Sequence, residues 1–138
     1  MKKFEESMFF ILDTVSDGIY VAILRGKDEL ASIKLEKEES RKSEAIIFKT
    51  IKDLFKRTKL GFDDIDCYGV INGMGSWTGA RIGVAIIKAF TLGGSQKIIE
   101  LEKMDISDLE EKYKNNSFVR LDKLEPRYEE YIVRTKSV

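Results

Sequence analysis

Three short segments near the start of the chain have the apolar pattern of β-strands. Residues 8–15 (MFFILDTV) and 19–24 (IYVAIL) are apolar runs with aromatic and β-branched side chains, which is typical of buried strands. Residues 30–35 alternate apolar with polar or small side chains, as a half-exposed strand does. Because turn signals at residues 17–18 (Asp-Gly) and 25–28 separate the segments, the pattern predicts an antiparallel meander of three strands.

Helical spacing follows the charged residues 36–42, which predict a solvated loop. Over residues 43–60, apolar side chains recur at the spacing of about 100° per residue that a helix gives. They cover roughly half of the helix surface, which is more than packing on one sheet face requires. Gly61 is the expected C-cap of this helix. The apolar stripe consists of Ile47, Ile51, Leu54 and Phe55, and Ile46 and Phe48 widen it.

Strands and helices alternate in the second half of the chain. The whole order, three strands and then helix, strand, helix and strand, predicts an α/β fold. In this fold the antiparallel meander is continued by parallel strands, with helices packed on the sheet, as in the core lobe of ribonuclease H-like and actin-like (ASKHA) proteins. We expect one domain over residues 1–138, with its core at about residues 8–103. The further elements expected are strands at 66–72 and 97–101, helices at 78–92 and 106–113, a turn at Asn115-Asn116, and strands or extended segments at 118–121 and 131–134.

The helix expected at residues 78–92 is apolar on both sides, and Arg81 and Lys88 are its only charged residues. A helix that is apolar all round must be covered all round, whereas a small two-layer domain covers one face only. We therefore predict that the two long helices form an interface with another protein. The alternative is that the C-terminal tail folds over the second face. One side of the helix carries Ile82, Ala85, Ile86, Ala89 and Phe90, and the opposite side carries Val84, Ile87 and Thr91.

Small residues contribute to this interface prediction. Gly79 and Gly83 are four residues apart, with Ala80 beside them, so another backbone can approach the helix closely. Trp77 is read either as an interface anchor or as a cover for the sheet edge. The expected partner interface consists of Ile46, Phe48, Trp77, Gly79, Ala80, Gly83, Val84, Ile87 and Thr91.

The glycine-rich segment GMGSWTGARIG, residues 73–83, has two interpretations. Amide groups at a helix N-terminus attract anions, so the segment could contact a phosphate or a nucleotide. It is not a P-loop motif, however, and no lysine is placed to reach a phosphate. The sequence favours a structural role, in which the first glycines allow a tight turn and Ser76 or Thr78 caps the helix. The residues of the nucleotide interpretation are Asp13, Gly73, Gly75, Ser76, Thr78 and Arg81.

Asp13 and Arg81 each have a second interpretation. Asp13 ends the first strand, where actin-like ATPases place an acid that handles metal or phosphate, but an Asp at this position also commonly caps a turn. Arg81 would either face a partner or bond carboxylates and carbonyls near the glycine-rich segment. The sequence leaves both roles of Arg81 open.

The amino-acid composition excludes several kinds of catalytic and metal site. Lys plus Arg and Asp plus Glu each total 24, so the chain lacks the net basic charge that drives direct nucleic-acid binding. There is no histidine, which excludes Ser-His-Asp and Cys-His catalysis and histidine metal sites. The single cysteine, Cys67, is expected to be a buried small hydrophobe. We expect no cofactor and no metal, and the lack of an apolar run of membrane-spanning length predicts a cytoplasmic protein.

The segment GMGSWTGARIG and the apolar helix after it resemble the G-x-G-S-[FW]-T-G-x-R-x-G signature of the TsaB (YeaZ) family. Residues 11–14 (ILDT) and the next strand resemble the opening hairpin of that family. Residues 41–47 (RKSEAII) resemble its R-x-H-S-E-x-L helix start, and residues 126–134 (PRYEEYIVR) resemble its terminal P-x-Y-x-R element. Together these segments span most of the chain.

The chain also differs from the family pattern. Lys42 stands where the family usually has histidine, and Met74 replaces the usual proline. The chain is short, so residues 104–138 are interpreted as a reduced C-terminal extension of a member that keeps mainly the N-terminal lobe.

The resemblance implies a function. TsaB-like proteins are non-catalytic partners of TsaD, the enzyme that transfers a threonylcarbamoyl group to an adenosine beside the tRNA anticodon. The ATPase TsaE also joins this complex, and TsaB binds TsaD, or a second copy of itself, through helices of the N-terminal lobe. The resemblance therefore implies an accessory subunit with TsaD-like and TsaE-like partners, indirect contact with tRNA and no membrane association. The alternatives are a small actin-like nucleotide-binding protein or ATPase, and a degenerate paralogue that only homodimerises.

Overall fold

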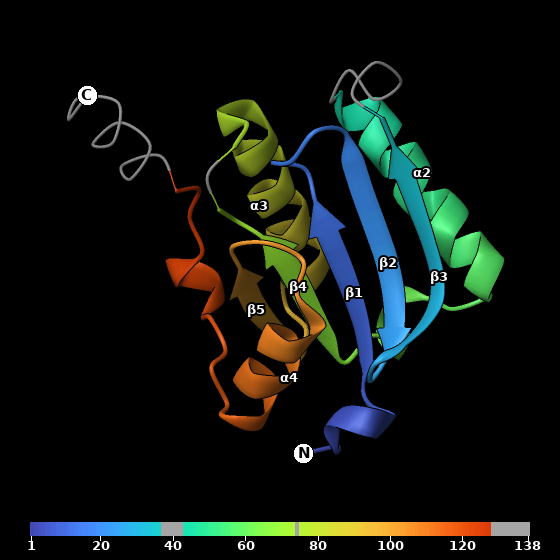
Figure 1. Cartoon of the computed structure of the whole chain (residues 1–138), viewed down its shortest axis with the longest axis vertical. Coiled ribbons are helices and arrows are strands. Elements are labelled where there is room, and N and C mark those ends of the chain that lie inside the picture. The colour runs from blue at the N-terminus through green and yellow to red at the C-terminus, as the bar shows by residue number, and fades with distance from the viewer. Residues whose placement is uncertain (37–42, 74, 128–138) are drawn as a thin grey trace.

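A single five-stranded sheet organises the protein. The computed structural model describes residues 1–36, 43–73 and 75–127. The strand order is β3-β2-β1-β4-β5, in which β1, β2 and β3 are antiparallel and β1, β4 and β5 are parallel (Figure 1). The predicted meander continued by parallel strands is therefore confirmed. The elements are η1 Phe4–Glu6, β1 Met8–Asp13, β2 Ile19–Arg25, β3 Asp28–Leu35, α2 Glu44–Thr58, η2 Phe62–Asp64, β4 Cys67–Ile71, α3 Trp77–Thr91, β5 Lys97–Leu101, α4 Ile106–Lys114 and η3 Leu121–Lys123.

Helices lie on both faces of the sheet, so the domain has three layers and not the two that we expected. Alternate residues of β1 point to opposite faces. Phe10 and Leu12 belong to the core shared with α2 and α3, whereas Phe9 and Ile11 belong to the core shared with η1 and α4. Figure 1 shows α4 on the side of the sheet nearer to the viewer. The long helices α2 and α3 consequently share one face.

The end of α2 differs from the prediction. Ser43 caps its N-terminus, where the side-chain oxygen accepts a hydrogen bond from the amide of Ile46 at 3.2 Å. At the other end, Lys59 adopts the left-handed conformation with φ 58° and acts as the C-cap. The prediction that Gly61 is the C-cap is wrong, because the helix has already ended two residues earlier. Gly61 instead precedes η2, and its amide donates to the Asp64 carboxylate at 2.8 Å.

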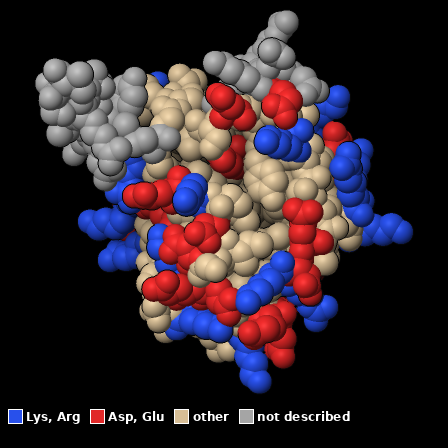
Figure 2. All heavy atoms as spheres, in the orientation of Figure 1, with Lys and Arg blue, Asp and Glu red and all other residues tan. Residues whose placement is uncertain are grey.

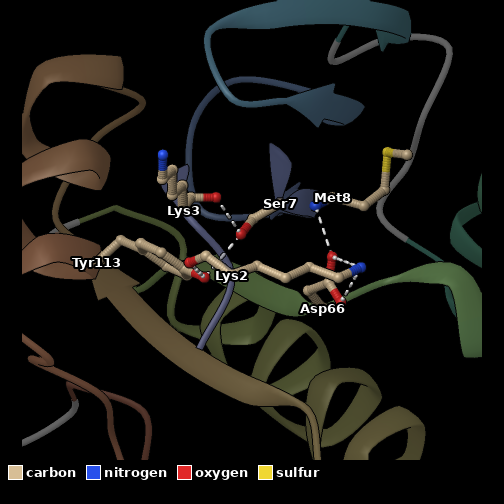
Figure 3. A network of polar contacts seen from close by, with 6 residues as sticks. All are labelled: Lys2, Lys3, Ser7, Met8, Asp66 and Tyr113. Carbon is tan, nitrogen blue, oxygen red and sulfur yellow. Dashed lines mark hydrogen bonds and ion pairs between the residues drawn. The ribbon is translucent and has the colours of Figure 1, made fainter. Parts of the chain in front are cut away.

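A polar network ties the N-terminus to α4 and β4 (Figure 3). The buried Ser7 and Tyr113 hydroxyl oxygens lie 2.6 Å apart. The Tyr113 hydroxyl also lies 2.8 Å from the Lys2 carbonyl, and the Ser7 hydroxyl lies 2.8 Å from the Lys3 carbonyl. Asp66, just before β4, accepts from the first amide of β1 at 2.9 Å and pairs with the Lys2 ammonium at 3.2 Å. The network therefore fixes α4 against the start of β1.

The segment after α4 lies along the free edge of β5. The amide of Val119 donates to the Ile98 carbonyl at 2.8 Å, so this residue lies beside β5, but residues 118–121 form no strand of the sheet and Leu121 begins η3. Leu124 is fully buried in the core that contains α2 and α3. The predictions for the loop at 37–42, for Met74 and for the segment 131–134 lie outside the described residues.

Candidate partner interface

The side of α3 chosen for the partner interface faces the sheet. Val84, Ile87 and Thr91 have exposed fractions of 4%, 0% and 4% within this single chain. Val84 and Ile87 belong to the core under the sheet, and the Thr91 hydroxyl donates to the Ile87 carbonyl at 2.8 Å. The prediction that these three residues form an accessible surface is therefore wrong, because their own sheet already covers them.

The opposite side of α3 is accessible only in part, because Ile86 on that side is buried and Phe90 is half-buried. Ala85, Ala89 and Leu92 are exposed, and Ile82 is half-buried. These residues follow one another at spacings of three and four, so they form one stripe along the helix. We call Ile82, Ala85, Ala89 and Leu92 the α3 outer stripe. The sequence correctly indicated that α3 is apolar on two sides, but not which side faces its own sheet.

The glycines of α3 pack against the end of β1 and not against a partner. A Cβ atom added to Gly79 would lie 1.7 Å from the Thr14 carbonyl oxygen, and one added to Gly83 would lie 2.5 Å from the Thr14 hydroxyl. The Thr14 hydroxyl also donates to the Gly79 carbonyl at 2.6 Å. Ala80 is buried beside them. The prediction of close backbone approach is confirmed, but the backbone belongs to this chain, so Gly79, Ala80 and Gly83 are not accessible to a partner.

An apolar groove of about 720 Å³ opens between α2, η2 and α3. Three aromatic residues from these three elements line it: Phe48, Phe62 and Phe90. Phe48 and Phe62 are 46% and 44% exposed, which is unusual for phenylalanine. The Phe62 ring centre lies 4.6 Å from that of Phe90, and the Phe48 ring centre lies 6.4 Å from it. These contacts bring Phe48 together with two aromatics that the sequence analysis did not assign to the interface.

Lysines form the rim of the groove. Lys52, Lys56 and Lys59 line it, and among the described residues no carboxylate does. Within residues 1–36, 43–73 and 75–127, none of these three ammonium groups lies within ion-pair distance of a carboxylate. The groove therefore combines an aromatic floor with a positively charged border.

Two other predicted interface residues lie away from the groove. Ile46 is half-buried and packs against the core from α2. It is two residues from Phe48, so the two side chains point to opposite flanks of the helix. Trp77 begins α3 and is half-buried, with the guanidinium of Arg81 5.8 Å from its ring centre. Arg81 thus packs on Trp77, which is a contact within the chain.

The residues of the nucleotide interpretation differ in their surroundings. Asp13 lines a smaller cleft of about 450 Å³ with Ser16, Asp17 and Lys34, but the other candidates do not line it. The Asp13 carboxylate accepts from the Val15 amide at 3.0 Å and from the Ser16 amide at 3.1 Å, so it closes the turn after β1. The candidates that do not line this cleft are Gly73, Gly75, Ser76, Thr78 and Arg81.

The glycine-rich segment serves the start of α3. The Ser76 side-chain oxygen accepts from the Gly79 amide at 2.9 Å, so Ser76 rather than Thr78 is the N-cap. A Cβ atom on Gly75 would lie 2.3 Å from the Val15 carbonyl oxygen, and one on Gly73 would lie 2.4 Å from the Glu102 carbonyl oxygen. Both glycines are therefore required by close backbone contacts within the chain.

The remaining candidate groups carry little reactivity. Cys67 is fully buried in β4, as predicted, and burial raises the pKa of its thiol, so the nucleophilic thiolate is disfavoured. No cluster of three or more carboxylate, cysteine or histidine side chains suited to a metal occurs among the described residues. In the same part of the chain, no helix has the length and apolar character needed to cross a bilayer.

Sequence reasoning missed Phe62 and Phe90 as accessible groove residues. Phe90 was assigned to an apolar side of α3, but without a link to α2. Phe62 lies in a three-residue 3₁₀ helix, which is too short to show periodicity. The available signal was a phenylalanine placed directly after Gly61 and before two aspartates, where a solvated loop would not require an aromatic residue.

Comparison with known proteins identifies similar folds. No family model matches the chain, and no curated protein matches it. Among solved structures, YeaZ from Pseudomonas aeruginosa matches with a TM-score of 0.63 and 18% identity, over 80% of this chain and 50% of that chain. An uncharacterized protein from Pseudomonas aeruginosa, described as similar to the peptidase YeaZ, matches with a TM-score of 0.58 and 18% identity, over 69% and 43% of the two chains. The chain thus has the fold of a YeaZ-like, actin-like lobe and spans about half the length of these proteins or less.

Proposed function

We propose that this chain belongs to the TsaB (YeaZ) family and acts as a non-catalytic accessory subunit of a TsaD-like enzyme. That enzyme would transfer a threonylcarbamoyl group to the adenosine beside the tRNA anticodon. The sequence resemblance and the shared fold support the family assignment. A TsaE-like ATPase as a further partner, indirect contact with tRNA and a cytoplasmic location belong to the same proposal.

The accessible aromatic groove is the observation that carries the proposal. Phe48 and Phe62 keep nearly half of their surface in contact with water, although Phe48 makes an edge-to-face contact with Phe90 and Phe62 makes one with the buried Phe55. Folding of the isolated domain does not require this exposure, whereas a partner that covers the groove would bury it. The α3 outer stripe adds further accessible or half-buried apolar residues, two of which are alanines.

A peptidase function, which the description of one similar structure mentions, is not favoured by the residues of this chain. There is no histidine to activate a serine nucleophile. The Ser76 oxygen caps α3, and the Cys67 thiol is buried. Accordingly, neither candidate nucleophile has the base or the access that covalent catalysis needs.

The test compares two exposed apolar residues in a binding experiment with the TsaD-like protein of the same organism. Phe48 is 46% exposed and lies in the groove; Leu30 is 47% exposed and lies on the edge strand β3. Phe48→Glu should weaken the complex by about 30-fold or more, because a central aromatic anchor contributes about 2 kcal/mol or more. Leu30→Glu should leave the affinity unchanged.

The complex is measured by light scattering on a sizing column and by titration calorimetry. A chain that forms no complex with the TsaD-like protein at micromolar concentration would refute the proposal. Equal weakening by Phe48→Glu and Leu30→Glu, with both variants folded by circular dichroism, would place the contact elsewhere on the molecule.

A further inference from the structure

We propose that the groove between α2, η2 and α3 binds an amphipathic helix whose apolar residues are flanked by carboxylates. For the identity of the partner, the TsaD-like enzyme, this inference rests on the proposed function. The chemistry of the groove itself can be tested without that partner.

The shape and lining of the groove fit the apolar side of a helix. Its volume of about 720 Å³ exceeds what one side chain fills, and it lies between two helices that share one face of the sheet. Helices bind such grooves through residues at positions i, i+3 or i+4, and i+7. Phe48, Phe62 and Phe90 provide the aromatic floor for these anchors.

The charges at the groove rim determine which residues would flank the apolar anchors of the bound helix. Lys52, Lys56 and Lys59 line the groove. The aliphatic stem of a lysine can cover apolar surface while its ammonium group stays in water. Asp63 and Asp64 follow Phe62 but do not line the groove, and the Asp64 carboxylate is bound to the Gly61 amide. The groove border is therefore net positive, so acidic residues beside the anchors would be attracted and basic residues repelled.

A second copy of this chain fits the groove less well. In a symmetric dimer the same patch meets itself, which would bring the lysine rims of two copies together. In a head-to-tail contact the copy would have to present an acidic apolar helix. The acidic residues of α4 lie on a helix whose apolar residues Leu109 and Tyr113 are already buried. Figure 2 shows that acidic and basic side chains are interspersed on the α4 face of the molecule, so this face offers no patch of a single sign.

The experiment uses two synthetic helical peptides of about 20 residues with the same leucine stripe, one flanked by glutamates and the other by lysines. Binding to the full chain is measured by fluorescence anisotropy at low salt and again at high salt. We expect the glutamate peptide to bind about tenfold tighter at low salt, and this preference to shrink at about 0.5 M NaCl because salt screens exposed charges.

Charge variants test whether the lysines at the groove rim cause the preference for the glutamate peptide. The double variant Lys52→Glu, Lys56→Glu should invert the preference, and the neutral variant Lys52→Gln, Lys56→Gln should abolish it even if the reversal impairs folding. The matched control is Lys49→Glu, Arg57→Glu, which makes the same change of charge on exposed residues of α2 outside the groove lining. This control should keep the preference for glutamate.

Each outcome decides the inference. Equal affinity for the two peptides, or binding of neither, would overturn it, as would a homodimer that the lysine reversal dissociates. The glutamate peptide should also displace the TsaD-like protein from the wild-type chain. If that protein does not bind while the glutamate preference holds and follows the lysines, the proposed function fails and the chemistry of the groove stands.

Discussion

The substitution Gly79→Ala separates packing within the chain from packing against a partner. In an exposed helix, replacing glycine by alanine stabilises by about 1 kcal/mol, because alanine loses less entropy on folding. Here the new Cβ atom would lie 1.7 Å from the Thr14 carbonyl oxygen, whereas ordinary contact begins at 3.4 Å. The two backbones would have to separate by about 1.7 Å, because neither atom belongs to a flexible side chain.

That separation has a cost that follows from the contacts. The 2.6 Å hydrogen bond from the Thr14 hydroxyl to the Gly79 carbonyl would break, leaving buried polar atoms unpaired at about 1–3 kcal/mol. Moving α3 away from the sheet also loosens the packing around Val84, at about 1–3 kcal/mol. After the gain in helix propensity, we expect a net loss of about 3 kcal/mol, or roughly 10 °C in Tm.

Urea denaturation followed by circular dichroism measures the difference, with Gly61→Ala as the control. Gly61 has φ −111°, and a Cβ atom there would lie 3.8 Å from its nearest neighbour, so alanine should be neutral or slightly stabilising. If Gly79→Ala proves as stable as the wild type, the glycine is not required by the Thr14 contact. Gly79 would then have to be explained by something outside this chain.

Two further predictions concern buried polar groups. Tyr113→Phe should lower the free energy of unfolding in urea by about 1–2 kcal/mol, because the Lys2 carbonyl loses its hydrogen-bond donor. The control Tyr20→Phe removes a hydroxyl that bonds Glu29 near the surface, and it should cost less than about 0.5 kcal/mol. Equal costs of the two substitutions would contradict the role of the network around Tyr113. Burial raises the pKa of the Cys67 thiol above its ordinary 9.0, so the folded state holds this proton more tightly and stability should fall as pH rises above about 9. Cys67→Ala should flatten this fall between pH 8 and 10, and an unchanged slope would refute it.

The strands and their succession along the chain could be predicted because each signal was local. Strand β5 was predicted at its observed bounds, and β1 ends two residues earlier than expected because Asp13 closes a turn with the Val15 and Ser16 amides. The hairpin after β1 follows from Gly18, whose φ of 83° suits glycine. Hydrophobic periodicity and turn residues can be read from neighbouring positions in the sequence, without knowing which residues lie across the sheet.

The candidate groove and the accessible residues of α3 could be predicted only in part, because they depend on contacts between distant segments. A helical wheel shows that α3 has two apolar sides, but not which side faces the sheet. The glycines indicate which side faces the sheet. The side with Gly79 and Gly83 allows close approach of another backbone, and in the structure this is the backbone of Thr14, directly after β1. The groove could not be predicted from the sequence, because it is formed by Phe48, Phe62 and Phe90 from three different elements.

The outer residues of α2 and α3 do not all carry the same weight as evidence for a partner. Alanine is the best helix former, so Ala85 and Ala89 would occupy exposed positions of α3 even without a partner. Helix propensity does not explain Phe48, because aromatic residues are poorer helix formers and an exposed ring gains little from burial. The exposed aromatic residues are therefore the stronger evidence for the proposed partner, and the alanines bear only on how closely such a partner could approach. A charge at Phe48 should accordingly weaken binding more than a larger apolar residue at Ala89, which would only increase the distance between the helices.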